Sequence, residues 1–142
     1  MEQPKPSLFQ SKKQVLARSM TRQEYNDYRD WPLPENELHL ADEAGYLVEY
    51  VDGGTSNDPR HEGYISWSPA DVFGRSHSMI DTPKQRLQLE QRELFEKLTK
   101  LEEFLDKGKP EFISEDHWDL LQAQFTAMDA YNDILAKRIF NF

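Results

Sequence analysis

Residues 81–108 read DTPKQRLQLEQRELFEKLTKLEEFLDKG, and this stretch decides the fold of the C-terminal half. Asp81-Thr82-Pro83 supplies a helix cap followed by a proline suited to the first helical turn. Leucines then recur every three or four residues, which predicts an amphipathic helix that ends at Gly108. Ser114 begins a second helix with the same spacing. Because the connection is short, we expect an antiparallel helical hairpin over residues 81–142.

Each of these two helices has an apolar stripe too wide for the other helix to cover completely. The first module or a second copy of the chain must therefore bury the remainder, which predicts a homo-oligomer. We expect the partner interface to include Leu87, Leu94, Leu98, Leu101, Trp118, Phe125, Met128 and Leu135. Gln91 and Asn132 interrupt the stripes and are candidates for polar residues that set the helix register.

The chain before the hairpin divides into a polar N-terminal arm, residues 1–19, and a small α+β module, residues 20–76. In this module Thr21-Arg22-Gln23-Glu24 matches a capping box and predicts a helix over residues 22–30. Tyr46–Val51 and Gly63–Trp67 are rich in β-branched and aromatic residues and predict an antiparallel β-hairpin. The predicted fold class is α+β: a β-hairpin and short-helix module followed by a long antiparallel α-helical hairpin.

The 142 residues contain 17 Lys and Arg, 26 Asp and Glu and no Cys, giving a net charge of −9. Residues 1–30 contribute +2, residues 31–81 contribute −8 and residues 82–142 contribute −3. This excess of negative charge disfavours direct binding to nucleic acids and to anionic lipid surfaces. With no apolar run long enough for a membrane span, we expect a soluble intracellular protein. The absence of Cys excludes disulfides and thiolate zinc sites.

Catalytic and metal motifs are missing from the sequence. His61-Glu62 resembles the start of a zinc-protease HExxH helix, but Ile65 stands where the second His is needed and Gly63 breaks the helix. No phosphate-binding glycine loop or G-x-S-x-G elbow is present. We therefore expect no enzyme activity, no metal and no cofactor.

Asn57, Arg60, His61 and Tyr64 form the densest cluster of side chains able to bind a polar ligand. An Arg side chain can bind a phosphate, His and Asn can hydrogen-bond to a base or a ribose, and a Tyr ring can stack on a base. In a regular strand Tyr64 and Trp67 point to opposite faces and do not share a site. Two alternatives stay open: the aromatic residues serve packing alone, or the acidic stretch Glu35–Glu62 mimics DNA.

Residues 20–75 resemble a small module of tailed-phage and prophage accessory proteins. The matching stretches are YLVEY at 46–50, DGG at 52–54 and GYISWSP at 63–69. In such proteins this module often precedes another domain, including those of anti-Thoeris nucleotide sponges. Residues 82–142 are similar to a helical-hairpin family first named from a crAss-like phage, through Gln85-Arg86, Glu93-Leu94, Lys97-Leu98, Leu101, Phe104, Leu120-Leu121, Gln124, Met128, Tyr131, Ile134-Leu135 and Arg138-Ile139.

These resemblances imply a non-enzymatic phage accessory protein that acts in the cytoplasm of the infected bacterial host. The function that we expect first is inhibition of a host defence by binding a host defence protein. The alternatives are an oligomeric sponge that sequesters a nucleotide immune signal, a nucleotide-processing enzyme using His61 and Asp58, and a DNA mimic.

Overall fold

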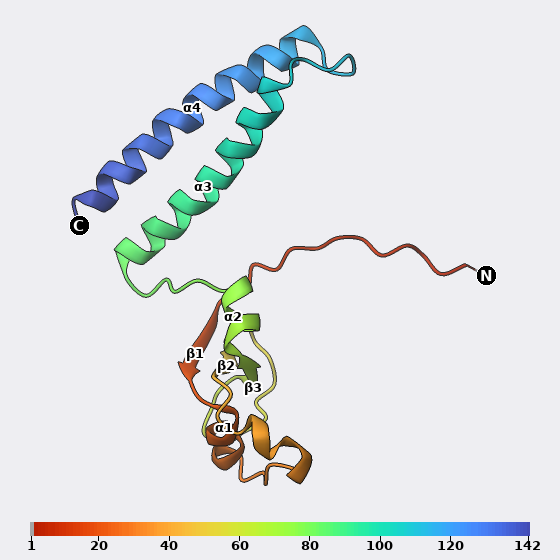
Figure 1. The fold of residues 1–142 in the computed structure, drawn as a ribbon, viewed down its shortest axis with the longest axis vertical. Helices are drawn as coiled ribbons and strands as arrows, with labels where there is room; N and C mark the ends of the chain where they lie inside the picture. The colour runs from red at the N-terminus through yellow and green to blue at the C-terminus, as the bar shows by residue number, and fades with distance from the viewer. Residues whose placement is uncertain (1) are drawn as a thin grey trace. The chain divides into compact units, whose positions relative to one another are not determined.

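The computed structural model describes residues 2–142. The chain divides into two compact units, with the boundary between His77 and Ser78. The first unit contains a three-stranded sheet with short helices and the second contains two long helices (Figure 1). The α+β fold class predicted from the sequence is confirmed. In chain order the elements are β1 (Val15–Ser19), α1 (Arg22–Tyr28), the 3-10 helix η1 (Glu35–Leu40), β2 (Gly45–Tyr50), β3 (Tyr64–Pro69), α2 (Ala70–Ser76), α3 (Pro83–Asp106) and α4 (Glu115–Phe140).

The sheet is antiparallel with the order β1-β2-β3. Strand β2 is central, and its Leu47 lies opposite Arg18 of β1 and Trp67 of β3. Strand β1 lies within the stretch expected to be a polar arm. Its side chains are exposed except for half-buried Val15, so it carries no alternating apolar pattern. Pairing with β2, a tertiary interaction, makes it a strand.

Helix α1 packs on one face of this sheet and forms the core of the first unit. Thr21 caps the helix, since its hydroxyl accepts a hydrogen bond from the backbone N–H of Glu24 at 3.1 Å. Tyr25 of α1 is buried against Leu47 and Ile65. Trp67 lies beside this core, and its indole N–H donates to the carbonyl of Met20 at 2.8 Å. On the other face, α2 stacks Phe73 on Tyr46 with ring centroids 4.5 Å apart.

Two glycines allow the close backbone approaches that this sheet requires. A Cβ atom on Gly45 would lie 2.3 Å from the Trp67 ring, and one on Gly63 would lie 2.0 Å from the carbonyl oxygen of Tyr50. Both distances are far below van der Waals contact, so any larger residue forces the strands apart.

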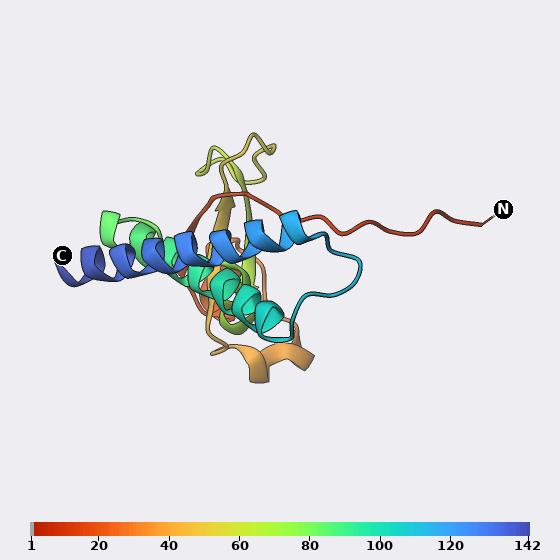
Figure 2. The ribbon, with the colours of Figure 1, turned by 90° about the horizontal axis from the view of Figure 1, so that it is seen from above.

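Helices α3 and α4 pack against each other and lie side by side in Figure 1, whereas α4 passes over α3 in the view from above (Figure 2). Thr82 and Gln85 form a reciprocal capping box at the start of α3, and Ser114 caps α4 through the N–H of His117. Leu87, Leu98 and Leu135 are buried in the seam between the helices. Among the helices that the structure describes, none is both long and apolar enough to cross a membrane.

Candidate functional site

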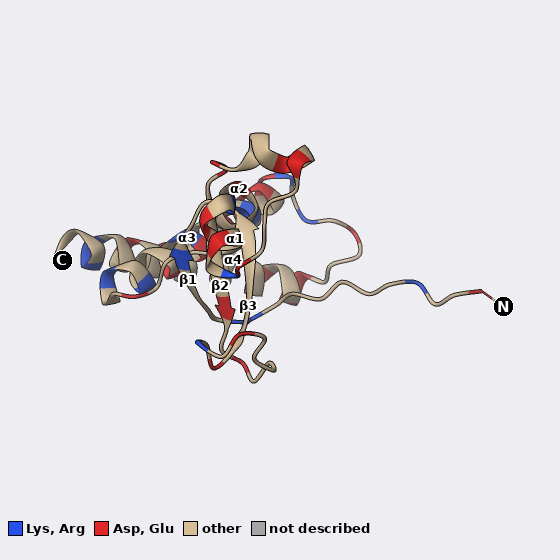
Figure 3. Ribbon diagram, turned by 90° about the horizontal axis from the view of Figure 1, so that it is seen from below, with Lys and Arg blue, Asp and Glu red and all other residues tan. Residues whose placement is uncertain are grey.

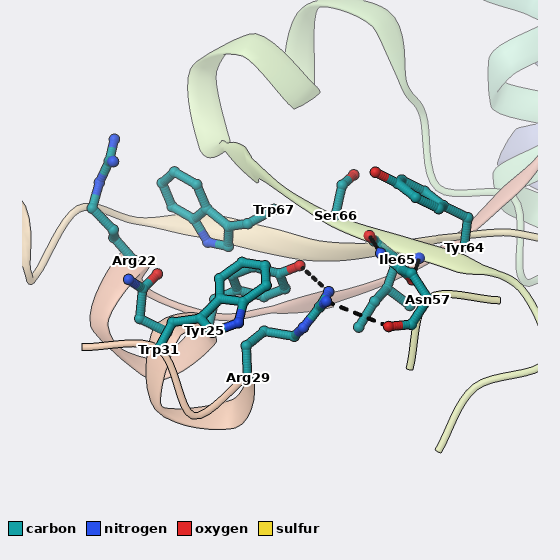
Figure 4. A pocket seen from close by; sticks show the side chains of 10 residues that line it. Arg22, Tyr25, Arg29, Trp31, Asn57, Tyr64, Ile65, Ser66 and Trp67 are labelled. Atoms are coloured by element: carbon teal, nitrogen blue, oxygen red, sulfur yellow. Dashed lines mark hydrogen bonds between the residues drawn. The ribbon is translucent and has the colours of Figure 1, made fainter. Parts of the chain in front are cut away.

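A pocket of about 320 Å³ opens between α1 and the edge of β3 (Figure 4). Arg22, Tyr25, Asn26 and Arg29 line one side, because spacings of three, four and seven residues place side chains on one face of a helix. The rest of the lining comes from Trp31, Asn57, Tyr64, Ile65, Ser66 and Trp67. The pocket thus combines aromatic rings with two guanidinium groups.

Arg29 is held in place within this lining. Its Nη1 donates to the Tyr25 hydroxyl at 3.0 Å and its Nη2 to the backbone carbonyl of Asn57 at 3.4 Å (Figure 4). Its Nε lies 3.9 Å from the carboxylate of Asp58, and only 10% of its side chain is exposed. The guanidinium also lies over the Trp31 ring, 4.2 Å from the ring centroid. These contacts leave a fixed, pre-positioned cation at the pocket wall.

Arg22 forms the second cationic wall. Its guanidinium lies 5.0 Å from the ring centroid of Trp67, and its Nη2 donates to Glu43 at 2.7 Å. Glu43 does not line the pocket. The ten described residues that line it include two arginines and no Asp, Glu or His. Both arginines are paired with carboxylates just outside the lining, Arg22 with Glu43 and Arg29 with Asp58, so the pocket offers guanidinium donors whose positive charge is largely balanced.

Strand β3 is an edge strand, and the Asn57 side chain covers part of that edge. Its amide accepts from the N–H of Ile65 at 2.8 Å and donates to the carbonyl of the same residue at 2.9 Å. The pocket wraps around this edge and receives Tyr64 from one face of the sheet and Trp67 from the other. The prediction that Tyr64 and Trp67 do not share a site is wrong, because it assumed a site confined to one face.

Of the four ligand-binding candidates from the sequence, Asn57 and Tyr64 line this pocket, whereas Arg60 and His61 lie outside it. Arg60 donates to Asp58 from its backbone N–H and from its guanidinium at 2.8 to 3.0 Å. Asp58 is 7% exposed, and the Arg60 guanidinium holds the pKa of its carboxyl well below the usual range. The hydrogen bonds between Arg60 and Asp58 hold the loop that carries Asn57.

His61 belongs to a separate network on the β1 side of α1. Its Nδ1 bonds to the Glu49 carboxylate, and its Nε2 lies 2.6 Å from the Tyr28 hydroxyl. The hydrogen bond from His61 lowers the pKa of Glu49. A smaller cavity of about 220 Å³ adjoins this network, lined by Leu16, Ala17, Arg18, Tyr28, Leu47, Glu49 and His61. Asp58 and His61 bond through their side chains to different partners.

The residues predicted for a partner interface lie in the seam of the helical hairpin. Leu87, Leu98 and Leu135 are buried there, and Leu94, Leu101, Trp118, Phe125 and Met128 are half-buried. Gln91 and Asn132 meet across the same seam, with an amide hydrogen bond of 2.9 Å. Within residues 2–142, no group of three or more His, Asp or Glu side chains is arranged to hold a metal ion.

Sequence reasoning missed Arg22, Arg29 and Trp31 as pocket residues. The helical spacing of Arg22, Tyr25 and Arg29 was a usable signal, because the helix itself was predicted. Trp31 carried no such signal, since it follows the helix and its position depends on the turn between Tyr28 and Trp31.

Comparison with known proteins bears on the second unit. Residues 81–141 match the family model described as Sequestin. The match spans α3, the connecting loop and α4, so it agrees with the helical C-terminal region predicted from the sequence. No curated protein and no solved structure matched the chain.

Proposed function

We propose that this protein is a non-enzymatic sponge that sequesters a nucleotide immune signal in the pocket between α1 and β3. The observation that carries this proposal is the lining of that pocket, which joins Trp31, Tyr25 and Trp67 to the guanidinium groups of Arg22 and Arg29. Its volume of about 320 Å³ falls in the range of small-molecule sites.

The chemistry of the lining suits the two halves of a nucleotide. Trp31 is 49% exposed and offers a ring face on which a base can stack. Arg22 and Arg29 have guanidinium N–H groups beyond those that bond to Glu43, Tyr25 and Asn57, and these can donate to phosphate oxygens. Asn26 and Ser66 add polar side chains that can bond to a ribose or a base edge.

Charge distribution bears on whether the pocket can hold an anionic ligand. A net charge of −9 repels phosphates unless basic groups are concentrated at one place. The lining contains two arginines and no acidic residue, but Arg22 is paired with Glu43 and Arg29 with Asp58 just outside it, so a phosphate has to compete with these carboxylates. Because the lining joins aromatic rings to guanidinium donors, we favour a nucleotide over the host-protein target expected first from the sequence.

Binding without turnover is supported by what the lining contains. Nucleotide hydrolysis generally needs a general acid, a general base or a metal, and no His, Asp or Glu side chain belongs to the described lining. Residues 81–141, in the second unit and outside the pocket, match a family whose name, Sequestin, points to sequestration. Removal of a signal nucleotide in an infected bacterial cytoplasm would inhibit a host defence, as the phage resemblances imply.

The test is ligand capture followed by recovery. The full chain is incubated with a panel of mononucleotides, cyclic nucleotides and adenine-ribose nucleotides, filtered to remove free ligand, and then denatured by heat. We expect one class to be retained and released with unchanged mass. A Trp31→Ala variant should bind roughly five- to 150-fold more weakly, since one base stack contributes roughly 1–3 kcal/mol.

Leu38→Ala is the matched control, because Leu38 is 55% exposed and lies outside the pocket. It should bind as the wild type does. Release of a product instead of the intact nucleotide would contradict sequestration and favour a nucleotide-processing enzyme. Equal retention by the Trp31→Ala variant would contradict this pocket as the site.

Binding of a host defence protein is a second candidate, favoured by the surface around η1. Glu35 and Glu37 lie in η1 and Asp42 follows it, and acidic positions are drawn in red on the ribbon (Figure 3). Leu38, between Glu37 and Asp42, is 55% exposed. An apolar side chain among carboxylates suits a basic partner surface. A pull-down from infected cells, compared between wild type and Leu38→Asp, would support this candidate if one host protein is lost from the variant.

A further inference from the structure

Helix α4 carries a second apolar stripe, separate from the one that packs on α3. Its members are Leu120, Ala123, Ala127, Tyr131 and Ile134, and all five are exposed. The exposed fractions reach 67% for Leu120, 54% for Ile134 and 41% for Tyr131. A continuous apolar line that stays exposed after the hairpin has packed marks an interaction surface.

Helical geometry shows that this stripe is a distinct face. At about 100° per residue, the stripe residues lie within roughly 40° of the direction of Ala127. The seam residues Phe125, Met128 and Leu135 lie roughly 80–160° away from that direction. At one edge of the stripe the Tyr131 hydroxyl bonds to the Glu90 carboxylate of α3. The other four residues, Leu120, Ala123, Ala127 and Ile134, point away from α3, and the stripe is here called the Ala127 face.

Charges at the two ends of the Ala127 face are arranged symmetrically. Asp116 precedes Ala127 by eleven residues and Arg138 follows it by eleven, and both lie close to the same line along the helix. Neither residue takes part in an ion pair within residues 2–142. Leu120 and Ile134 are likewise spaced by seven residues on either side of Ala127.

We propose that two copies of the chain associate through this face, with their α4 helices antiparallel and crossing at Ala127. In that arrangement Asp116 of each copy meets Arg138 of the other, and each Leu120 meets an Ile134. A twofold interface requires a self-complementary patch of this kind. Ala123 and Ala127 are small enough to let the helix axes approach to about 8 Å.

The partner at the Ala127 face is a second copy of the chain, because the charges and apolar residues of this face are complementary to themselves. A host protein or an apolar ligand would not require an acid and a base placed at equal distances from a central alanine. The proposal concerns α4 alone and does not depend on what the pocket of the first unit binds.

The absence of cysteine from the chain permits a direct test by crosslinking. In the crossing proposed, the two Cα atoms of residue 127 lie within roughly 5 Å, a distance that a disulfide spans. Ala127→Cys in the full chain should form a covalent dimer under mild oxidation. Thr126→Cys is the matched control, because Thr126 is also exposed but points roughly 100° away. Equal crosslinking of the two variants would overturn the proposal.

A charge exchange provides an independent readout. By light scattering at micromolar concentration, the wild type should be a dimer, and Asp116→Arg or Arg138→Asp alone should weaken it several-fold. The double variant Asp116→Arg/Arg138→Asp should restore the dimer, because each new pair again has opposite signs. A monomeric wild type, or a double variant weaker than both single variants, would contradict the interface. Circular dichroism confirms that each variant keeps its helices.

Discussion

Asp58 links three parts of the first unit through one carboxylate. It accepts hydrogen bonds from the backbone and guanidinium of Arg60, lies 3.9 Å from Arg29, and is 7% exposed. Arg60 in turn donates to the carbonyl of Tyr28 at 2.6 Å, at the end of α1. The pocket wall formed by Arg29 and Asn57 therefore depends on a group that does not line the pocket itself.

This arrangement predicts a pH dependence of stability. The pKa of Asp58 is lower in the folded chain than its ordinary value of 3.8, because Arg60 donates to the ionised form. The resulting stabilisation is present above the ordinary value and is lost as the pH falls below it. Asp58→Asn should lower Tm near neutral pH, and the difference from wild type should shrink as the medium is acidified. A difference in Tm that stays constant with pH would contradict this account.

Asn57 predicts a second effect at the residue scale. Its amide satisfies both outward-facing backbone groups of Ile65, so Asn57→Ala leaves a donor and an acceptor unpaired. We expect a loss of about 1–3 kcal/mol in the free energy of unfolding, measured by urea denaturation. Asn26→Ala, which removes an amide from the same pocket without touching the strand edge, should cost less than about 0.5 kcal/mol. Equal losses would show that the edge bonds contribute little.

At the scale of elements, local patterns predicted most of the fold. The caps at Thr21, Thr82 and Ser114, the helical stripes and the two later strands follow from residue types at short spacing. Strand β1 was not predicted in this way, because Val15–Ser19 is largely exposed and becomes a strand only by pairing with β2. Of the ten residues that line the pocket, the candidates named from the sequence include only Asn57 and Tyr64, because the contribution of Arg29 arises from packing between α1 and β3.

The hairpin seam predicts an asymmetric response to substitution. Asn132→Leu leaves the Gln91 amide without its partner and should lower the free energy of unfolding by about 1 kcal/mol. The double variant Gln91→Leu/Asn132→Leu should recover this loss, because no half-buried amide is left unpaired in the seam. Denaturation followed by helical circular dichroism measures both. A double variant less stable than Asn132→Leu would contradict the role assigned to this pair.

At the scale of the whole molecule, a pocket lined by two paired arginines lies in a strongly acidic chain. The repulsion of an anionic ligand by the whole chain depends on salt, because charges are screened beyond about 30 Å at 0.01 M salt but beyond about 8 Å at 0.15 M. At low salt the ligand meets the repulsion of the whole chain, and at higher salt it meets mainly the charged groups next to the pocket.

We therefore expect the association rate of a nucleotide to rise as salt increases from about 0.01 M to 0.15 M. Stopped-flow fluorescence measures this rate. A neutral nucleoside serves as the control and should show little change. A nucleotide association rate that falls steeply with salt would contradict the predicted balance of charges.

Tryptophan fluorescence tests the central claim most directly. The chain has three tryptophans, of which Trp31 and Trp67 line the pocket and Trp118 lies in the hairpin. In a Trp118→Phe variant all the indole emission comes from the pocket. Titration with the nucleotide retained in the capture experiment should quench this emission saturably, with the same dissociation constant as the wild type. Saturable binding by calorimetry with unchanged emission would contradict the claim that the aromatic pocket between α1 and β3 holds the ligand.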